Sequence, residues 1–257
     1  MKWTLINARS VCNKFTELYQ VLYDCDYDIV LITETWLNDK FPNSIIDPHN
    51  CYYIFRCDRS AATGGGVCVL VSKRYNAVEV CVPRISTTLE ICCVDIDCSG
   101  VICRTCLVYR PPKSTNMPEI IDSLRCLIET RGPCIIAGDL NCKDINWAPM
   151  EAPIDGVHDL LLDFCVSYGF TQLTNEPTRS SSLLDIVLSN TPLTVCDSRV
   201  TCPFSNSDHS QVEFTTFFES PNRGGSPRTA SHHHKYYDWK NADFAGISQY
   251  LSSVDWA

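Results

Sequence analysis

Acids and amides follow short apolar runs at several points of this chain, and these are the residues best suited to chemistry. Residues 135–138 form such a run, and Asp139 and Asn141 come directly after it. A second run, residues 28–33, ends at Glu34. Such runs are typical of buried strands, and catalytic side chains usually lie on the loops at strand ends. A simple turn would also explain an Asp and an Asn here, so the argument depends on the pattern being repeated.

The pattern recurs in three further segments. Asp185 lies inside the apolar segment 183–188, Asp208 and His209 precede another apolar run, and Asn7 ends the first one. A buried carboxylate is costly unless it is paired or bound to a metal. We therefore expect these strand ends to converge on one polar site.

Ten strands and three amphipathic helices are expected to position these residues. Apolar residues at helical spacing predict helices over residues 15–25, 120–128 and 157–168. Strands are expected near residues 3–7, 28–33, 51–56, 66–72, 77–82, 89–96, 101–108, 133–138, 184–188 and 211–217. Many strands with few helices favour two packed sheets flanked by helices over a single parallel sheet. The expected fold class is therefore α/β (α+β).

Seven short motifs occur in order along about residues 1–218. They are Asn7-Ala8-Arg9-Ser10, Glu34-Thr35-Trp36-Leu37, Gly64-Gly65-Gly66-Val67, Val108-Tyr109-Arg110-Pro111-Pro112, Gly138-Asp139-Leu140-Asn141, Leu184-Asp185 and Ser207-Asp208-His209. This series resembles the endonuclease/exonuclease/phosphatase superfamily, the DNase I-like metal-dependent phosphodiesterases. More narrowly, it resembles the apurinic-type endonuclease domain of non-LTR (LINE-type) retrotransposons. The resemblance implies a four-layer sandwich of two mixed β-sheets flanked by helices.

The resemblance also implies a metal ion. It gives Glu34 as the main ligand of Mg²⁺, with Asp208 and Asn7 nearby, either directly or through water. Hard oxygen ligands suit Mg²⁺, and Mn²⁺ is expected to substitute for it.

Five further residues are implied as catalytic. Asp139 would orient or deprotonate the attacking water, and Asn141 would hydrogen-bond that water or a phosphate oxygen. Tyr109 would donate its phenol proton to a phosphoryl oxygen. His209 would stabilise the phosphoryl charge, and Asp185 would fix its tautomer and favour its protonated form.

Phosphate contacts are expected from residues flanking this set, which are Arg9, Arg59, Arg110, Thr178 and Arg179. Structural alternatives stay open for several site residues. Glu34 would also suit a helix cap, Tyr109 a core position with a bonded hydroxyl, and Asp208-His209 an exposed turn.

Size and charge agree with one such domain. The chain has 257 residues, is 45% hydrophobic and carries a formal net charge of −9. This length allows a single large α/β domain. The negative charge argues mildly against a protein that simply coats DNA, whereas a hydrolase that binds a divalent cation needs clustered carboxylates.

The 17 cysteines lie within apolar runs and are expected to be reduced structural residues. No segment approaches 18 uninterrupted apolar residues, and no signal peptide precedes the first strand, so no membrane contact is expected. The expected location is intracellular, and nuclear at the point of action.

The composition changes after Phe218. Residues 219–235, which include His232-His233-His234, are expected to form a flexible linker. Residues 236–257 are similar to the start of the segment that leads to the reverse transcriptase in these elements, so such a domain is expected to follow in the parent polypeptide. Gly64-Gly65-Gly66 is expected to be a tight turn, since no phosphate-loop residues follow it.

Three functions therefore stay open. The first is a Mg²⁺-dependent DNA endonuclease that nicks one strand and leaves a 3′-hydroxyl to prime reverse transcription. The second is a phosphatase or phosphodiesterase of the same fold that acts on a lipid or inositol headgroup. The third is a non-catalytic remnant that keeps the fold as a binding module.

Overall fold

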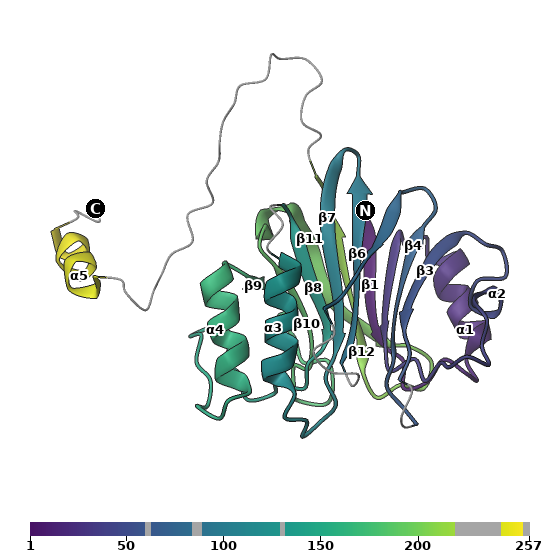
Figure 1. Cartoon of the computed structure of the whole chain (residues 1–257), viewed down its shortest axis with the longest axis horizontal. Coiled ribbons are helices and arrows are strands. Elements are labelled where there is room, and N and C mark those ends of the chain that lie inside the picture. The colour runs from purple at the N-terminus through teal and green to yellow at the C-terminus, as the bar shows by residue number, and fades with distance from the viewer. Residues whose placement is uncertain (60–62, 84–88, 129–131, 219–242, 254–257) are drawn as a thin grey trace, which may run out of the picture.

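Two six-stranded β-sheets form the centre of the protein, whose computed structural model describes residues 1–59, 63–83, 89–128, 132–218 and 243–253 (Figure 1). Sheet A contains, in spatial order, β11 (Val195–Pro203), β12 (Ser210–Thr216), β1 (Lys2–Asn7), β2 (Ile29–Thr33), β4 (Val67–Ser72) and β3 (Tyr52–Cys57). Sheet B contains β5 (Ala77–Val80), β6 (Glu90–Cys98), β7 (Val101–Tyr109), β8 (Cys134–Asp139), β10 (Asp185–Ser189) and β9 (Thr171–Gln172).

Each sheet is mixed and has one parallel pair at its centre. β1 and β2 are parallel in sheet A, and β7 and β8 are parallel in sheet B. The remaining pairings in both sheets are antiparallel. The carboxyl ends of two parallel strands lie at the same edge of a sheet, so each sheet brings two such ends together.

Helices cover the outer faces of both sheets and complete four layers (Figure 1). On sheet A these are α1 (Phe15–Tyr19), which continues as a π-helical turn over Gln20–Asp24, and α2 (Asn43–Ile46). On sheet B they are α3 (Met117–Ile128) and α4 (His158–Tyr168). A 3₁₀ turn spans Pro192–Thr194, and α5 spans Phe244–Ser253 near the C-terminus. None of the helices in the described part of the chain is long and apolar enough to cross a membrane.

Three apolar layers alternate with the sheets and helices. In β2, Ile29 and Leu31 lie in the core between the sheets, whereas Val30 and Ile32 lie in the core beneath α1. Successive side chains of a strand point to opposite faces, and both faces of these central strands are covered. This explains why their sequences are continuous apolar runs and do not alternate. The structure shows no disulfide among the described cysteines, most of which are buried.

The expected elements are present, with differences at the edges. All ten expected strands occur, with ends shifted by one or two residues, and so do the three expected helices. α2, β9 and β11 were not expected. β11 is an edge strand whose register shifts twice, between Cys196 and Arg199 and between Thr201 and Pro203. These bulges remove the alternation by which a strand is recognised in sequence.

The tail contains one described helix. The expected linker, residues 219–235, lies outside the described residues, as does His232-His233-His234. α5 lies within the segment 236–257 that was expected to begin the connection to a further domain.

Gly138 supplies a test of how tightly β7 and β8 pack. It has a φ of +142°, and a Cβ at this position would lie 1.8 Å from the carbonyl oxygen of Val108. Gly138→Ala is expected to lower the free energy of unfolding by about 3 kcal/mol or more in urea denaturation, since a strand must move. Gly169→Ala is the matched control, because Gly169 also has a positive φ but a Cβ there meets nothing within 4 Å. That control should cost only about 1–2 kcal/mol, and equal losses would contradict the clash.

Candidate active site

The polar residues expected to do chemistry lie at one edge of the two sheets. The carboxyl ends of the four central strands carry Asn7, Glu34, Tyr109 and Asp139. β10 and β12 run antiparallel to these strands, so their first residues lie at the same edge. Asp185 begins β10, and His209 immediately precedes β12. The topology therefore gathers residues from six strands that are far apart in the sequence.

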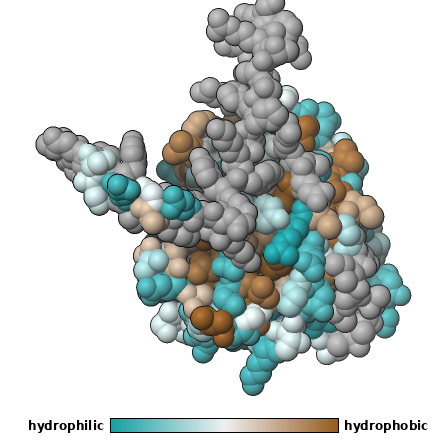
Figure 2. Space-filling view, turned by 60° about the vertical axis from the view of Figure 1, so that its left-hand side comes forward, coloured by the Kyte–Doolittle hydropathy of each residue, from teal (hydrophilic) through white to brown (hydrophobic). Residues whose placement is uncertain are grey.

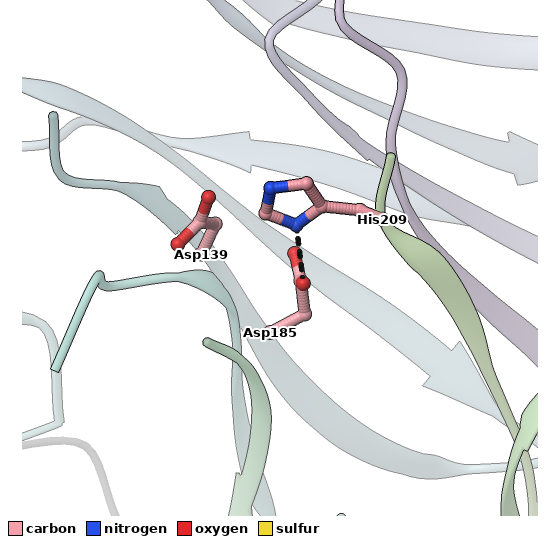
Figure 3. Close-up of side chains that lie close together, drawn as sticks. All are labelled: Asp139, Asp185 and His209. Atoms are coloured by element: carbon pink, nitrogen blue, oxygen red, sulfur yellow. Dashed lines mark hydrogen bonds and ion pairs between the residues drawn. The ribbon is translucent and has the colours of Figure 1, made fainter. Parts of the chain in front are cut away.

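A buried cluster of two carboxylates and one imidazole forms the centre of this edge (Figure 3). Asp185 and Asp139 face each other in the register of β10 and β8. His209 Nδ1 lies 2.7 Å from Asp185 Oδ2, and both side chains are almost fully buried. One ligand atom from each of Asp139, Asp185 and His209 lies within 4.8 Å of the others. The hydrogen bond expected between Asp185 and His209 is thus present.

Thr178 and Ser207 hold this pair in place. Thr178 Oγ1 accepts a hydrogen bond from the backbone N–H of Asp185 at 3.0 Å, and its carbonyl accepts one from Ser210, the residue after His209. Ser207 Oγ donates to the carbonyl of Asn7 at 2.7 Å and accepts from the N–H of His209. Thr178 was expected to contact phosphate, but it is buried and its hydroxyl is used within the protein.

Asn7 connects the two sheets at the site. Its side-chain nitrogen donates to Glu34 Oε1 at 3.1 Å and to Asp139 Oδ2 at 2.8 Å. Asn141 donates its backbone N–H to Asp139 Oδ1 at 3.0 Å. Burial raises the pKa of Tyr109, and the charges of Glu34 and Asp139 raise it further. The Tyr109 hydroxyl therefore stays protonated and can act as a hydrogen-bond donor.

Asp139 is a buried carboxylate whose charged form is disfavoured by its surroundings. Burial raises the pKa of Asp139 well above its usual range, and the charges of Asp185 and Glu34 raise it further. The hydrogen bonds from Asn141 and Asn7 oppose this shift only in part. Three carboxylates that converge in a buried site favour either a proton or a cation among them.

The donor set fits a divalent cation. Asp185 Oδ1 is buried and has no hydrogen-bond partner among the described residues. Carboxylate oxygens are the ligands that Mg²⁺ and Mn²⁺ prefer, and Asp139 and Asp185 supply them within the cluster. Glu34 lies next to this cluster, because the side-chain nitrogen of Asn7 donates to both Glu34 and Asp139. The cluster can therefore hold a metal ion.

Asp208 lies apart from this set. It is exposed, and Oδ2 lies 3.0 Å from Arg9 Nη1 and 2.6 Å from Arg179 Nη2. Partial burial raises its pKa, but the two arginines outweigh that effect and the pKa of Asp208 is lowered. Its carboxylate is thus neutralised by arginine in this structure, although the resemblance places it near the metal.

The five residues expected to contact DNA separate into two groups. Arg9 and Arg179 reach the surface around Asp208. Arg110 is buried and donates to the carbonyls of Leu140 and Ser114, so it supports the loop after β8. The remaining two, Arg59 and Thr178, are also bonded within the protein.

Arg59 forms an ion pair that sequence reasoning missed. Its Nε lies 2.7 Å from Glu90 Oε1, and Glu90 Oε2 accepts from the N–H of Gly66. Glu90 is buried and is the cross-strand partner of Tyr109, whose ring lies 5.7 Å from the Arg59 guanidinium. The only sign of this ion pair in the sequence is that Glu90 stands at the start of an apolar strand. The pair links the glycine turn of sheet A to the tyrosine of sheet B.

A groove of about 750 Å³ opens beside Asn141. It is lined by the basic residues Arg110, Lys113, Lys143 and Arg179 and also by the acids Asp144 and Asp155. The lining comes from loops next to sheet B and from His158, the first residue of α4. On the face that brings the α4 side forward, hydrophilic and hydrophobic residues are interspersed outside the grey segments (Figure 2).

Comparison with protein families explains this arrangement. The model of the Endonuclease/Exonuclease/phosphatase family matches residues 6–209, which is most of the chain. The protein belongs to the endonuclease/exonuclease/phosphatase family. Members of this family are metal-dependent hydrolases of phosphoester bonds, and the chain is such an enzyme. Comparison with curated proteins gives no match.

Solved structures of the family share the fold. The endonuclease domain of TRAS1, a telomere-specific non-LTR retrotransposon, is 18% identical with a TM-score of 0.67, over 84% of this chain and 97% of that one. An AP endonuclease from Archaeoglobus fulgidus is 14% identical with a TM-score of 0.65, over 84% and 99%. The 3′-5′ exonuclease NExo from Neisseria meningitidis is 16% identical with a TM-score of 0.66, over 85% and 100%. These matches show the DNase I-like fold.

Asp185 and His209 are expected to act as one coupled pair in phosphodiester cleavage. Asp185→Asn and His209→Ala are each expected to lower the rate of phosphodiester cleavage by roughly 10²- to 10⁴-fold. The double variant should be only a few-fold slower than His209→Ala, because coupled residues are not additive. Single-turnover rates measure this, with Asp122→Asn on the exposed face of α3 as the control. Losses that multiply would show that the two side chains act independently.

Removing the charge of Asp139 should stabilise the metal-free protein at high pH. Because the pKa of Asp139 is raised in the folded state, protonation of its carboxyl group stabilises the wild type at low pH. This contribution to the free energy of unfolding is lost as the pH rises through the folded-state pKa. In EDTA, Asp139→Asn should match the wild type in free energy of unfolding at pH 5 and exceed it by roughly 1–2 kcal/mol at pH 8. Urea denaturation at the two pH values measures the difference. Asp163→Asn changes an exposed carboxylate of α4 and is the control. Its effect on the free energy of unfolding should be the same at pH 5 and at pH 8.

Proposed function

We propose that this protein is a Mg²⁺-dependent DNA endonuclease that nicks one strand and leaves a 3′-hydroxyl end. The observation that carries the proposal is the buried Asp185–His209 pair beside Asp139, with Asn7 joining Asp139 to Glu34. This arrangement offers oxygen ligands, a water-orienting carboxylate and an imidazole within one edge of the fold. Metal-assisted hydrolysis of a phosphodiester uses an activated water and stabilisation of the charge that develops on the phosphoryl group.

The metal would be held by carboxylate oxygens. Glu34 would be the main ligand, and the Asn7 amide joins it to Asp139 of the Asp139–Asp185–His209 cluster. Asp185 Oδ1, which has no hydrogen-bond partner among the described residues, would be a further ligand. The ion would supply Lewis-acid stabilisation of charge on the phosphoryl group. Asp208 would instead hold Arg9 and Arg179 in place for phosphate contacts.

The protein residues divide the remaining work. Asp139 would orient the attacking water and accept its proton. Asn141 would hydrogen-bond the water or a phosphate oxygen. Tyr109, held protonated by its surroundings, would donate to a phosphoryl oxygen. His209, fixed by Asp185, would stabilise the negative charge that develops on the phosphoryl oxygens.

DNA would lie across the site and along the basic groove. Lys113, Lys143 and Arg179 in that groove supply local positive charge despite the net charge of −9. Backbone phosphates are bound by such local contacts, and their number sets the salt dependence of binding. The likeness to the TRAS1 endonuclease supports a role in retrotransposition, in which the nick primes reverse transcription by a domain of the same parent polypeptide in the nucleus.

A plasmid assay tests this function directly. The purified protein is expected to convert supercoiled plasmid to the nicked circle with Mg²⁺ or Mn²⁺ and to lose this activity in EDTA. Glu34→Gln keeps the side-chain size but removes the charge, so nicking should fall by at least about 100-fold. Agarose-gel quantification of the nicked form measures both effects.

Controls separate the alternatives. Glu79→Gln changes an exposed carboxylate on β5 and should nick at the wild-type rate. Mn²⁺ binding, followed by electron paramagnetic resonance, should weaken in Glu34→Gln more than in Asp208→Asn. Hydrolysis of phosphoinositide vesicles without plasmid nicking would favour a lipid phosphatase. The absence of both activities, with the fold and Mn²⁺ binding intact, would indicate a non-catalytic remnant.

A further inference from the structure

Trp36 occupies an unusual position two residues after Glu34. It is 40% exposed, whereas Trp3 is fully buried and Trp147 is half-buried, so it is the exposed tryptophan of the described residues. Its φ is +57°, in the left-handed region that bulky residues rarely adopt. Glu34 has a φ of +50° and shares this strained loop. Strain of this kind persists only where surrounding contacts fix the conformation, and it is concentrated at functional sites.

The contacts that fix Trp36 come from the glycine turn between β3 and β4. The N–H of Trp36 donates to the carbonyl of Gly65 at 2.8 Å, and the N–H of Thr35 donates to that of Gly66 at 3.2 Å. The indole N–H lies 3.4 Å from Glu34 Oε2. A Cβ on Gly64 would lie 3.6 Å from the indole nitrogen, so the ring edge rests on a residue without a side chain. The indole is thus anchored by one edge while much of its surface stays exposed.

The exposed indole of Trp36 lies next to Glu34, the candidate metal ligand. It is therefore placed to bind a flat apolar group that neighbours a phosphodiester. In the folded core, the large apolar side chains Trp3, Phe164 and Phe214 are instead fully buried. Exposing Trp36 has a hydrophobic cost, which a binding partner would remove. Nucleobases are the flat groups that flank the phosphodiester of DNA, and they stack on aromatic side chains.

We propose that Trp36 is a stacking platform for a nucleobase next to the cleaved phosphodiester. This inference rests on the proposed DNA endonuclease function and adds a binding role for a residue outside the catalytic set. Trp36 follows β2 of sheet A, whereas the basic groove is lined by loops next to sheet B and by the first residue of α4. Glu34, two residues before Trp36, is joined to Asp139 of the cluster through the side chain of Asn7. One flank of the DNA would therefore contact the groove and the other would contact the indole.

The test compares variants of the full-length chain on short duplexes with one mapped nick site. Trp36→Leu is expected to weaken duplex binding in EDTA by about 5- to 150-fold, equivalent to the roughly 1–3 kcal/mol of one base–aromatic stack. Trp36→Phe keeps an aromatic ring and should recover most of the affinity. Fluorescence anisotropy measures the dissociation constants. Tyr53→Leu, at an exposed aromatic residue of β3, is the matched control and should bind like the wild type.

A second substrate identifies the base involved. Duplexes that carry an abasic tetrahydrofuran unit at each position flanking the nick should show, at one position, the same affinity for wild type and Trp36→Leu. Tryptophan fluorescence of the wild type, but not of Trp36→Phe, should be quenched by the intact duplex.

Two results would overturn the stacking role while leaving the endonuclease intact. In one, Trp36→Phe loses as much affinity as Trp36→Leu and also loses Mn²⁺ affinity, which would make the indole N–H a support for Glu34. In the other, the loss in Trp36→Leu is the same on every abasic duplex. If the wild type neither nicks plasmid nor binds duplex, the proposed function fails and this inference fails with it.

Discussion

The burial of several carboxylates at one edge of two sheets is the constraint on which the rest of the site depends. Asp139 and Asp185 are almost fully buried and face each other in adjacent strands, and Glu34 joins them through Asn7. Uncompensated charges there would be costly. Hydrogen bonds from Asn141 to Asp139 and between His209 and Asp185 offset part of this cost, and Asp185 Oδ1 has no hydrogen-bond partner among the described residues. The carboxylates that are costly to bury are therefore the ones that could hold a cation.

Several basic side chains of this protein bond to groups inside the fold, and others reach solvent. Arg110 is buried against the carbonyls of the loop after β8, and Lys14 is buried with Nζ 2.7 Å from the carbonyl of Ala8. Arg59 pairs with buried Glu90 beside Tyr109. Arg9 and Arg179 reach solvent, where both bind Asp208. A positive charge in a sequence therefore does not by itself identify a phosphate contact, because a guanidinium satisfies buried carbonyls and carboxylates equally well.

The loops at the site are strained and tied together in pairs. Glu34, Trp36 and Asn141 all have positive φ, and each lies within a few residues of a strand end. The loop that carries Glu34 and Trp36 is bonded to the glycine turn, and Arg110 holds the loop of Asn141. These bonds fix the loops that carry the polar side chains of the candidate site, which is the condition for electrostatic preorganisation. Trp36 is held by the same bonds and stays exposed.

Ten strands and the polar residues at their ends could be predicted from the sequence alone, because burial on both faces leaves continuous apolar runs that stop at those residues. The family resemblance added the four-layer fold and the Asp185–His209 pair. Only the tertiary structure decided which basic residues point inward, that Asp208 binds two arginines, and that Glu90 supports Tyr109. The edge strand β11 escaped prediction since its bulges break the alternation. Apolar periodicity is a local property of the chain, whereas the partner of a charge is set by contacts between residues distant in sequence.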